Sequence, residues 1–537
     1  MFKSLNKGVS APIIIIIFIV IVLIGLSIFY FFYNKGRVID SFPDETKIWY
    51  KENLIVDTDF NQVKLLITKA LTISAGNYHA CATLSNKTIK CWGRNTFGQL
   101  GDGANIDKRT PTLVLGVDNA NAVSVGDDFT CATLSNGTIK CWGRNNYGQL
   151  GDGTNIDKRN PILVTGIDNA VSVSAGNNHA CALLSNGKIK CWGFNGAGQL
   201  GDGTNIDKRT PTFVSGIDTA VSVSAGFVHT CTVLANGKTK CWGGNQNGQL
   251  GDGTTINKNI PTLVSNIGNS MTGNVIMVSA GDSHTCATVE ADNTIRCWGD
   301  NDYGQLGDGT NNRRETPILV SEIRRAASVV AGDYFTCAVL SDGSMKCWGT
   351  NEHGQLGDGT NNRRRTPVLV SEINDAISAT AGRYFSCAIL SNGITKCWGQ
   401  NDFGQLGLGD EILQDKNIPV IVEGLKPANY GYLVSTNVLL DKTVANVHSF
   451  HYKASSIPSG CNLKIQFSQN RIDWYNSRGN IEEWDYLSQG NHSIDLSSLG
   501  WLGPNFFYKI RFESDLKCIP VLDEISVEYH KYRFLSY

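Results

Sequence analysis

One glycine-rich stretch occurs seven times in this chain and restricts the folds available to it. Residues 141–154 read CWGRNNYGQLGDGT. A second block of the type VSAGNNHACALLSNGKIK precedes each copy, and the glycines of successive blocks are 50, 50, 50, 55, 51 and 50 residues apart. A period of this length indicates stacked or circular repeats, because a unit of this size cannot bury its apolar face alone. The copies begin at Cys91, Cys141, Cys191, Cys241, Cys297, Cys347 and Cys397.

Each repeat contains short apolar runs separated by turn residues. In the second repeat the runs are 122–125, 130–134 and 138–142, and Ser-Asn-Gly separates the last two. Asn-Gly between two such runs is a strong hairpin signal. A Thr-Pro-x-x-Val segment such as 210–214 supplies a fourth, outer strand, where proline is tolerated. Three or four strands repeated seven times predict a seven-bladed β-propeller. We expect its closure to combine strands from both ends, 64–74 and 417–425.

The hairpin also places two cysteines opposite each other. A three-residue loop pairs Leu134 with Thr138, and counting back three residues on each side brings Cys131 opposite Cys141. Parity makes this a non-hydrogen-bonded pair, the closer kind, which suits a disulfide. Zinc binding would need C-x₂-C spacing or added histidines, and neither is present. The predicted cross-strand pairs are Cys81 with Cys91, Cys131 with Cys141, Cys181 with Cys191, Cys231 with Cys241, Cys286 with Cys297, Cys337 with Cys347 and Cys387 with Cys397.

The cysteines and the N-terminus together predict where the chain resides. Sixteen cysteines at fixed spacing indicate an oxidising compartment. Residues 12–33 are almost unbroken apolar sequence, long enough for a transmembrane helix, and a cleaved signal peptide is the alternative. The prediction is a single-pass membrane protein with its N-terminus inside and its bulk extracytoplasmic. Residues 1–11 would be a cytoplasmic tail, 34–61 a tether, 62–426 the propeller and 428–537 a further domain.

The last of these domains has no repeat. Residues 463–467, 508–512 and 525–529 alternate apolar and polar side chains, which predicts half-buried strands and a β-sandwich. Its start, GYLVST, and its end, PVLDEISVEY, resemble sandwich modules appended to secreted bacterial proteins. Cys461 and Cys518 flank two of the strands and could form a bridge. Three tryptophans could stack on sugar rings, although such residues are more often core: Trp474, Trp484 and Trp501.

The blocks AGxxHxCAxLSNG and WGxNxxGQLGDG resemble the repeats of the regulator of chromosome condensation family, over residues 64–426. The resemblance implies a seven-bladed propeller. It implies function only loosely, because the eukaryotic namesake is a guanine nucleotide exchange factor on chromatin, whereas other members bind proteins, including a bacterial inhibitor of β-lactamases. The exchange-active member uses a wedge that protrudes from the propeller. The one sizeable insertion here, about five residues near 269–277, argues against that activity.

Candidate catalytic and metal-binding residues in the repeats have structural explanations. His79, His179, His229 and His284 occupy a position that holds phenylalanine in the other three repeats, which indicates packing. The seven repeat tryptophans, from Trp92 to Trp398, are predicted core. Asp152, Asn155 and Asp157 carry oxygen ligands at short intervals but lack the EF-hand order, so turn capping is favoured over calcium. No cofactor, metal site or catalytic residue is predicted, and a net charge of −1 favours no nucleic acid.

The residues that vary between repeats indicate a binding face. The loop before the second strand and the loop after the third emerge at the same end of an antiparallel hairpin. They hold aromatic, arginine and acidic residues, the composition of a protein-binding surface, although drift on a solvated face would give the same pattern. The candidates are Tyr78, Arg94, Phe97, Asp128, Arg144, Tyr147, Phe194, Phe227, Asp300, Tyr303, Tyr334, His353, Tyr384 and Phe403.

The combined prediction is an all-β chain, a seven-bladed propeller plus a C-terminal β-sandwich with one N-terminal transmembrane helix. Its function would be protein binding without catalysis, by a membrane-anchored extracytoplasmic propeller whose protein partner is unknown. The alternatives are an adhesin-like surface protein that binds glycan through the sandwich, and a nucleotide exchange factor. The membrane would be contacted through residues 12–33.

Overall fold

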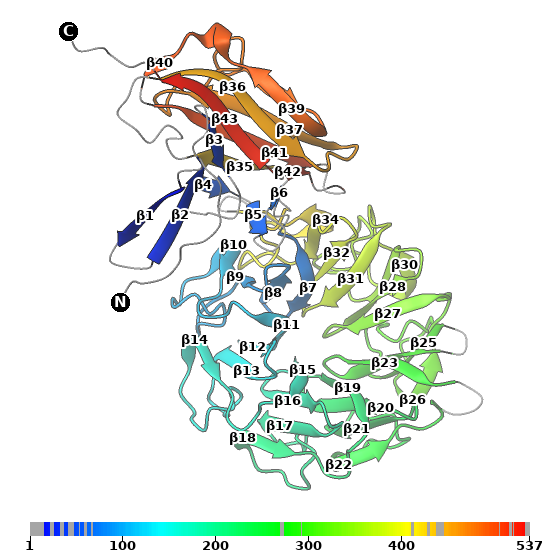
Figure 1. The fold of residues 1–537 in the computed structure, drawn as a ribbon. Coiled ribbons are helices and arrows are strands. Elements are labelled where there is room, and N and C mark those ends of the chain that lie inside the picture. The colour runs from blue at the N-terminus through cyan, green and yellow to red at the C-terminus, as the bar shows by residue number, and fades with distance from the viewer. Residues whose placement is uncertain are drawn as a thin grey trace, which may run out of the picture. The chain divides into compact units, whose positions relative to one another are not determined.

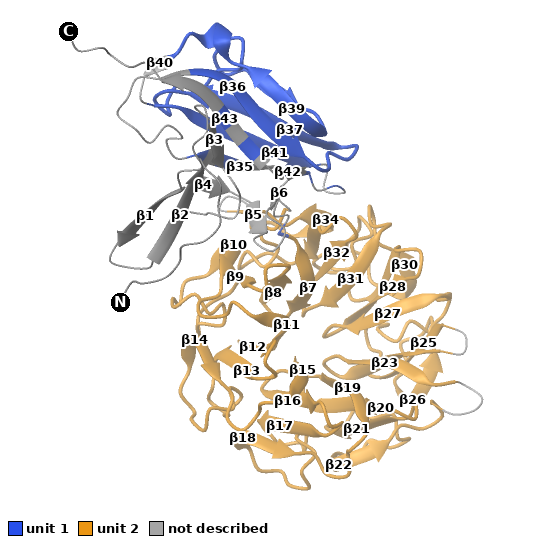
Figure 2. Ribbon diagram, viewed as in Figure 1, with its two compact units in different colours: residues 1–68, 427–537 blue, residues 69–426 orange. Residues whose placement is uncertain are grey.

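The chain divides into two compact units, residues 69–426 and residues 1–68 together with 427–537 (Figure 2). The structure is a computed structural model. Before residue 68 it describes only the backbone of six strands. After that it describes 68–426 except 269–272, 291–292 and 410–412, and 430–531 except 436–444, 504, 515–517, 519 and 523.

Residues 69–426 form seven four-stranded antiparallel sheets around a central axis, a seven-bladed β-propeller (Figure 1). We number the blades 1 to 7 in chain order, and each uses four consecutive strands. The innermost strands are β7 (Ala70–Ala75), β11 (Ala120–Val125), β15 (Ala170–Ala175), β19 (Ala220–Ala225), β23 (Val275–Ala280), β27 (Ala326–Ala331) and β31 (Ala376–Ala381). The second strands are β8 (His79–Leu84), β12 (Phe129–Leu134), β16 (His179–Leu184), β20 (His229–Leu234), β24 (His284–Val289), β28 (Phe335–Leu340) and β32 (Phe385–Leu390).

The third and fourth strands complete each blade. The third strands are β9 (Ile89–Gly93), β13 (Ile139–Gly143), β17 (Ile189–Gly193), β21 (Thr239–Gly243), β25 (Thr294–Gly299), β29 (Met345–Gly349) and β33 (Thr395–Gly399). The outer strands are β10 (Lys108–Leu113), β14 (Lys158–Leu163), β18 (Lys208–Phe213), β22 (Lys258–Leu263), β26 (Arg314–Leu319), β30 (Arg364–Leu369) and β34 (Lys416–Ile421). Each outer strand carries proline, which blunts the exposed edge of the sheet.

A disulfide and a tryptophan form the core between each pair of blades. Cys131 lies opposite Cys141 in the register of β12 and β13, with 4.1 Å between their Cα atoms. The same cluster holds Trp192 of the next blade, which is fully buried. Its indole nitrogen donates to the Gln149 backbone carbonyl at 2.9 Å. All seven blades carry this disulfide and this indole hydrogen bond.

Ring closure differs from the expectation that strands from both ends would combine in one blade. Blade 1 uses β7 to β10 and blade 7 uses β31 to β34, each from one stretch of chain. Closure repeats the contacts between other blades: Trp92 donates to the Gln405 carbonyl at 2.9 Å, and the Ala75 amide donates to Thr380 Oγ1 at 3.0 Å. No strand exchange is needed because side chains of each blade already bind the backbone of its neighbour.

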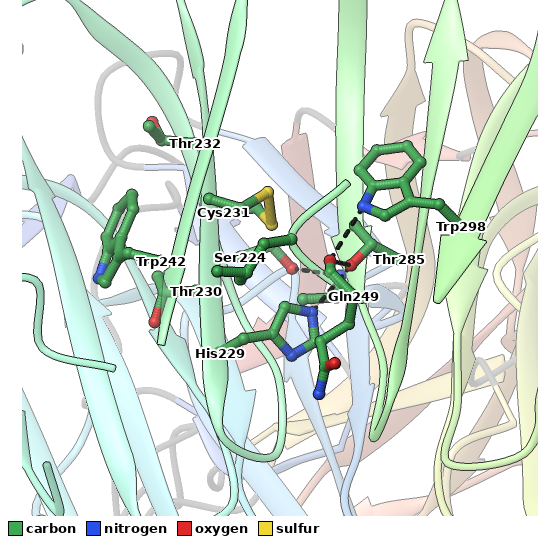
Figure 3. The surroundings of a disulfide bond; sticks show 12 residues. Ser224, His229, Thr230, Cys231, Thr232, Trp242, Gln249, Thr285 and Trp298 are labelled. Carbon is green, nitrogen blue, oxygen red and sulfur yellow. Dashed lines mark hydrogen bonds between the residues drawn. A yellow bond between two sulfur atoms is a disulfide. The ribbon is translucent and has the colours of Figure 1, made fainter. Parts of the chain in front are cut away.

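The four repeat histidines are buried and bind the next blade. His229 Nε2 lies 2.8 Å from Thr285 Oγ1, which also donates to the Gln249 carbonyl at 2.8 Å (Figure 3). Burial lowers the pKa of His229 to about 3, so the ring is neutral. The pairs are His79 with Thr130, His179 with Thr230, His229 with Thr285 and His284 with Thr336.

The three phenylalanines at this position follow a complementary rule. At the position of the threonine, the blade that follows Phe129 has Ala180, and the blade that follows Phe385 has Ala80. The blade that follows Phe335 has Ser386 there. The imidazole therefore occurs only where the next blade supplies a threonine hydroxyl. These histidines are structural, because their polar atoms are sealed between blades.

The second unit contains two sheets over one buried core. One sheet has the order β3 (Arg37–Asp40), β43 (Glu524–Lys531), β36 (Ala445–Ala454) and β39 (Gly490–Asp495), with β40 (Leu502–Gly503) beside β36. The other has the order β38 (Asp485–Leu487), β37 (Cys461–Ser468), β41 (Phe507–Ser514), β35 (Tyr430–Ser435) and β4 (Ile48–Glu52). Phe450 and Val527 from the first share a core with Ile465 and Ile510 from the second.

Smaller elements complete this unit. A disulfide joins Cys461 to Cys518, with 6.0 Å between their Cα atoms. The short strands β5 (Leu54–Asp57), β6 (Gln62–Leu65) and β42 (Val521–Leu522) form a third sheet, and a 3₁₀ turn covers Ser497–Leu499. Segment 34–61, predicted to be a tether, contributes three strands.

The predicted transmembrane helix over residues 12–33 is wrong. The backbones of β1 (Ile15–Ile21) and β2 (Leu26–Phe32) pair as antiparallel strands. No helix in the described part of the chain is long and apolar enough to cross a bilayer. Runs of isoleucine, valine and phenylalanine favour strands as readily as apolar helices. The localisation derived from that helix, with the N-terminus inside and the bulk outside, is wrong with it; residues 12–14, 22–25 and 33 lie outside the described residues.

Candidate functional site

Two loops of every blade meet at one end of the propeller. The first connects the innermost strand to the second, and the other connects the third strand to the outer one. They are joined by backbone hydrogen bonds: the Arg94 amide donates to the Tyr78 carbonyl, and the Arg144 amide to the Asp128 carbonyl, both at 2.9 Å. All fourteen predicted binding residues lie in these loops. We call this end the loop face.

A buried asparagine organises the longer loop. Asn145 Nδ2 donates to Asp152 at 3.1 Å and to two loop carbonyls, and its Oδ1 accepts from the Leu150 amide. The Asp152 carboxylate also accepts from the Thr154 amide and hydroxyl, and these bonds lower its pKa. Asp157 accepts from the Asn145 amide at 2.7 Å. The carboxylates expected to cap turns thus hold the loop rigid, and their oxygens face protein donors.

The loops of blades 7, 1 and 2 carry a chain of rings and guanidinium groups. The Tyr78 and Phe403 rings meet at 5.1 Å between centroids. The Arg94 guanidinium lies 5.6 Å from the Tyr78 centroid and 5.5 Å from that of Phe403. Arg144 lies over Phe97 at 5.0 Å and binds Asp128 at 3.3 Å. Each guanidinium group is attracted to the negative face of the ring beside it, so these cation–π contacts stabilise the positions of both side chains.

A second chain crosses blades 5, 6 and 7. Tyr303 contacts Tyr334 at 5.2 Å between centroids, and Tyr334 stacks near Tyr384 at 6.3 Å. His353 packs on Tyr384 at 5.0 Å. The two chains join at Arg383, whose guanidinium lies 5.1 Å from the Tyr384 centroid and 5.9 Å from that of Tyr78. One continuous arc of aromatic and cationic groups therefore spans blades 5, 6, 7, 1 and 2; we call it the aromatic arc.

The remaining candidates lie outside the arc or beside it. Phe194 contacts Tyr147 at 5.0 Å on blades 3 and 2. Phe227 is 39% exposed on blade 4. Asp300 accepts from Gln305 Nε2 at 2.8 Å, and burial raises its pKa. Blades 3 and 4 thus interrupt the series of rings.

A ring of residues at the axis was not grouped by sequence reasoning. Each blade contributes the residue after its Ala-Gly or Val-Gly step, and these residues surround a narrow axial cavity of about 90 Å³ that most of them line. Burial raises the pKa of Asp333 to about 8, and of Asp127 and Asp282 to about 6. The shared position in the repeat was a usable signal, but only the blade geometry shows that these side chains converge. The seven are Asn77, Asp127, Asn177, Phe227, Asp282, Asp333 and Arg383.

The tryptophans of the second unit have neighbours that occupy their faces. The Lys509 ammonium lies 4.6 Å from the Trp474 centroid and 5.1 Å from that of Trp484. Trp501 packs on Tyr475 at 5.7 Å and on Phe506 at 6.4 Å. These neighbours cover part of the ring surface of the three tryptophans.

Family comparison agrees with this architecture. The regulator of chromosome condensation (RCC1) repeat matches residues 91–133, 136–183, 186–233, 236–288, 293–339, 342–389 and 397–428, and a second description of the same repeat matches seven segments between 71 and 405. The chain belongs to the RCC1 repeat family. The first six matches of the first description begin near the third strand of one blade and end in the second strand of the next, so the sequence repeat is offset from the RCC1 blade.

Individual relatives share the fold at low identity. Yeast RCC1 (Prp20), solved bound to Kap60, is 22% identical with a TM-score of 0.56, over 65% of this chain and 86% of that one. Human WBSCR16 is 21% identical with a TM-score of 0.57, over 64% of this chain and 96% of that one. The human E3 ubiquitin-protein ligase HERC2 is 39% identical over 66 residues, 12% of this chain. The chain spans only 1% of the length of that curated relative.

Proposed function

We propose that this protein is a non-catalytic binding protein that uses the loop face of its RCC1 propeller to hold another protein. The observation that carries the proposal is the aromatic arc: rings and guanidinium groups from five blades already contact one another in the absence of a partner. Aromatic residues and arginine dominate the binding energy of protein interfaces. Rings packed against neighbours lose little conformational freedom on binding, which favours affinity.

The buried residues beneath the aromatic arc favour a binding function over a catalytic one. The four repeat histidines, the most obvious proton carriers, are fully buried and neutral, because burial lowers each pKa to about 3. A general base at neutral pH needs a pKa nearer to the working pH and access to substrate. The buried Asn–Asp networks and the disulfide within each blade fix the loops in place.

A photocrosslinking experiment on the full chain tests the proposal. The photoreactive residue p-benzoylphenylalanine replaces Phe403 or Tyr147 on the loop face, or Asn136 in the opposite turn as the matched control. We expect both loop-face positions to crosslink to the same protein in the native host and the Asn136 position not to. Crosslinking of a partner only from Asn136 would refute the proposal, as would capture at none of the three positions.

The second unit is proposed to be a β-sandwich that accompanies the binding propeller. Its support is the single core shared by two antiparallel sheets. Glycan binding and nucleotide exchange stay predictions; a glycan array and a nucleotide-release assay test them. Prp20p of Saccharomyces cerevisiae binds Gsp1p and histones, which is consistent with protein partners in this family.

A further inference from the structure

The aromatic arc ends at blade 5, and on the adjacent blade 4 the structure has a pocket of about 520 Å³. Its walls include Phe227 and Gly244 of blade 4 and Asp282 of blade 5, and its inner end reaches Asp333 and Tyr334. Volumes of this size are typical of ligand pockets. We call it the blade-4 pocket.

The pocket exists because blade 4 and the adjacent blade 3 depart from the repeat. Four blades place a ring at one loop position, as Phe97, Tyr147, Tyr303 and Phe403, and blade 6 places His353 there. Blade 3 has Ala197 and blade 4 has Asn247 instead, and both line the pocket. Gly244 stands where blades 1 and 2 have arginine. Blade 4 thus lacks a large side chain at both loop positions, and blade 3 lacks one at the position of the ring.

The lining of the pocket favours a positive charge. Asp282 and Asp333 line it, and Asp127 and Asp300 lie near enough to raise their pKa values further. The facing cation is Arg383, 3.7 Å from Asp333, and it also donates to the Tyr78 hydroxyl. Arg313, at the outer edge, is bound to the Gln246 carbonyl at 2.9 Å. Acidic groups outnumber cations at the inner end. Asp333, whose pKa is about 8, is protonated at neutral pH, and a bound cation would favour its ionised form, so a further cation would be stabilised there.

Two aromatic groups strengthen this preference. Phe227 is exposed at the pocket wall, and Tyr334 hydrogen-bonds to Asp282. A cation beside a ring gains from the negative face of the ring as well as from the carboxylates. This combination of rings with acids is the chemistry that binds ammonium and guanidinium groups.

A buried amide beside the pocket also has no partner. Gln99 Nε2 of blade 1 donates to Asp128 of blade 2, whereas Val228 of blade 4, the equivalent of Asp128, lines the pocket and has a side chain that accepts no hydrogen bond. Gln199 is fully buried and its Nε2 is unpaired among the described residues.

From these observations we infer that the blade-4 pocket receives a lysine or arginine side chain of the protein partner. This inference rests on the proposed function and adds the chemistry of the partner: a projecting segment with a basic residue, whose neighbours contact the aromatic arc. Charge complementarity selects this occupant over an acidic or purely apolar one.

Small probes test the pocket without knowledge of the partner. The probes are the N-acetyl methylamides of lysine, arginine, norleucine and glutamate, titrated to about 10 mM into the full-length protein and followed by saturation-transfer NMR, since single side chains bind at about the millimolar level. We expect lysine and arginine to bind at least about tenfold more tightly than norleucine, and glutamate not to bind.

Variants taken from the repeat itself locate the binding. Asn247→Tyr restores the ring that blade 5 has at Tyr303, and Arg313 can cover it as Arg363 covers Tyr303 at 4.7 Å. This variant should fold and lose cation binding at least about tenfold. Asp282→Asn should weaken it similarly, and Asp118→Asn, an exposed acid beyond the outer strand β10 at the opposite end, should leave it unchanged.

Three outcomes would overturn the inference: equal binding of norleucine and lysine, no binding of any probe, or binding that neither pocket variant changes. Each of these leaves the crosslinking test of the loop face untouched, because that test does not depend on blade 4. Conversely, a partner crosslinked only from the opposite end refutes the proposed function while the cation site stands.

Discussion

Replacing His229 and Thr285 by the Phe–Ala pair that blades 2 and 3 use isolates the effect of one buried imidazole. At about pH 7.5, Thr285→Ala alone leaves His229 Nε2 without its hydroxyl partner, which costs about 1–3 kcal/mol. His229→Phe alone places a larger ring against the threonine, at about 1–3 kcal/mol. In the double variant Phe meets alanine, as Phe129 meets Ala180. The two losses should therefore not add.

The pH dependence separates this account from simple repacking. The pKa of His229 is about 3 in the fold against 6.5 as its ordinary value, so the unfolded chain takes up a proton first as pH falls. Stability from this group is present above pH 6.5 and is lost between pH 6.5 and 3, by ~1.4 kcal/mol per pH unit. Moving from about pH 7.5 to about pH 5 should cost the wild type ~2 kcal/mol more than the double variant.

The assay is urea unfolding at both pH values, followed by the fluorescence of the buried tryptophans. The wild type, both single variants and the double variant form one thermodynamic cycle. If the double variant keeps the wild-type dependence on pH, the buried neutral imidazole is not the cause. If the single effects add, His229 and Thr285 do not act as a pair.

Three further predictions concern the bonds between and within blades. Changing Cys181 and Cys191 together to serine should lower the free energy of unfolding by ~3 kcal/mol, measured by urea unfolding without reductant; no loss would show that the bridge contributes nothing. Trp92→Phe, which removes the donor to Gln405, should cost about 1–2 kcal/mol, the same as Trp192→Phe in the same assay, and a much larger loss at Trp92 would mean that the closing contact is special. Alkylation with mass detection should find the 16 cysteines blocked until reduction, and free thiols in the native protein would contradict the pairing.

The sequence predicted what depends on local geometry. The position of Cys131 opposite Cys141 followed from one turn and the alternation of strands, and the structure has that register. The loop positions of Tyr78 and Phe403 followed from the direction of the same strands. Their contact did not, because it crosses from blade 1 to blade 7, and only the closed ring brings them within 5.1 Å.

Two features show why the rest was missed. The pairing of histidine with threonine was readable, since His179 occurs with Thr230 and Phe129 with Ala180, but it required comparing neighbouring repeats rather than aligned positions. The blade-4 pocket arises from the absence of large side chains, and an absence has meaning only once the surrounding loops are placed. The N-terminal apolar run was misread because apolar content alone does not distinguish a helix from paired strands.

The first and last residues of the propeller occupy positions that are held by consecutive residues at the other junctions between blades. The Ser85 amide donates to the Lys69 carbonyl as Ser135 donates to Asn119, and Lys90 Nζ donates to the Gly424 carbonyl as Lys140 donates to Gly116. By this equivalence Lys69 corresponds to Asn119 and Lys426 to Asp118, and residues 118 and 119 are joined by a peptide bond. The propeller is thus topologically a circle with one missing peptide bond. Circular permutants opened between any two blades should fold. Because its first and last residues are close together, the propeller can also be inserted into a loop of another domain without separating the two residues that it interrupts.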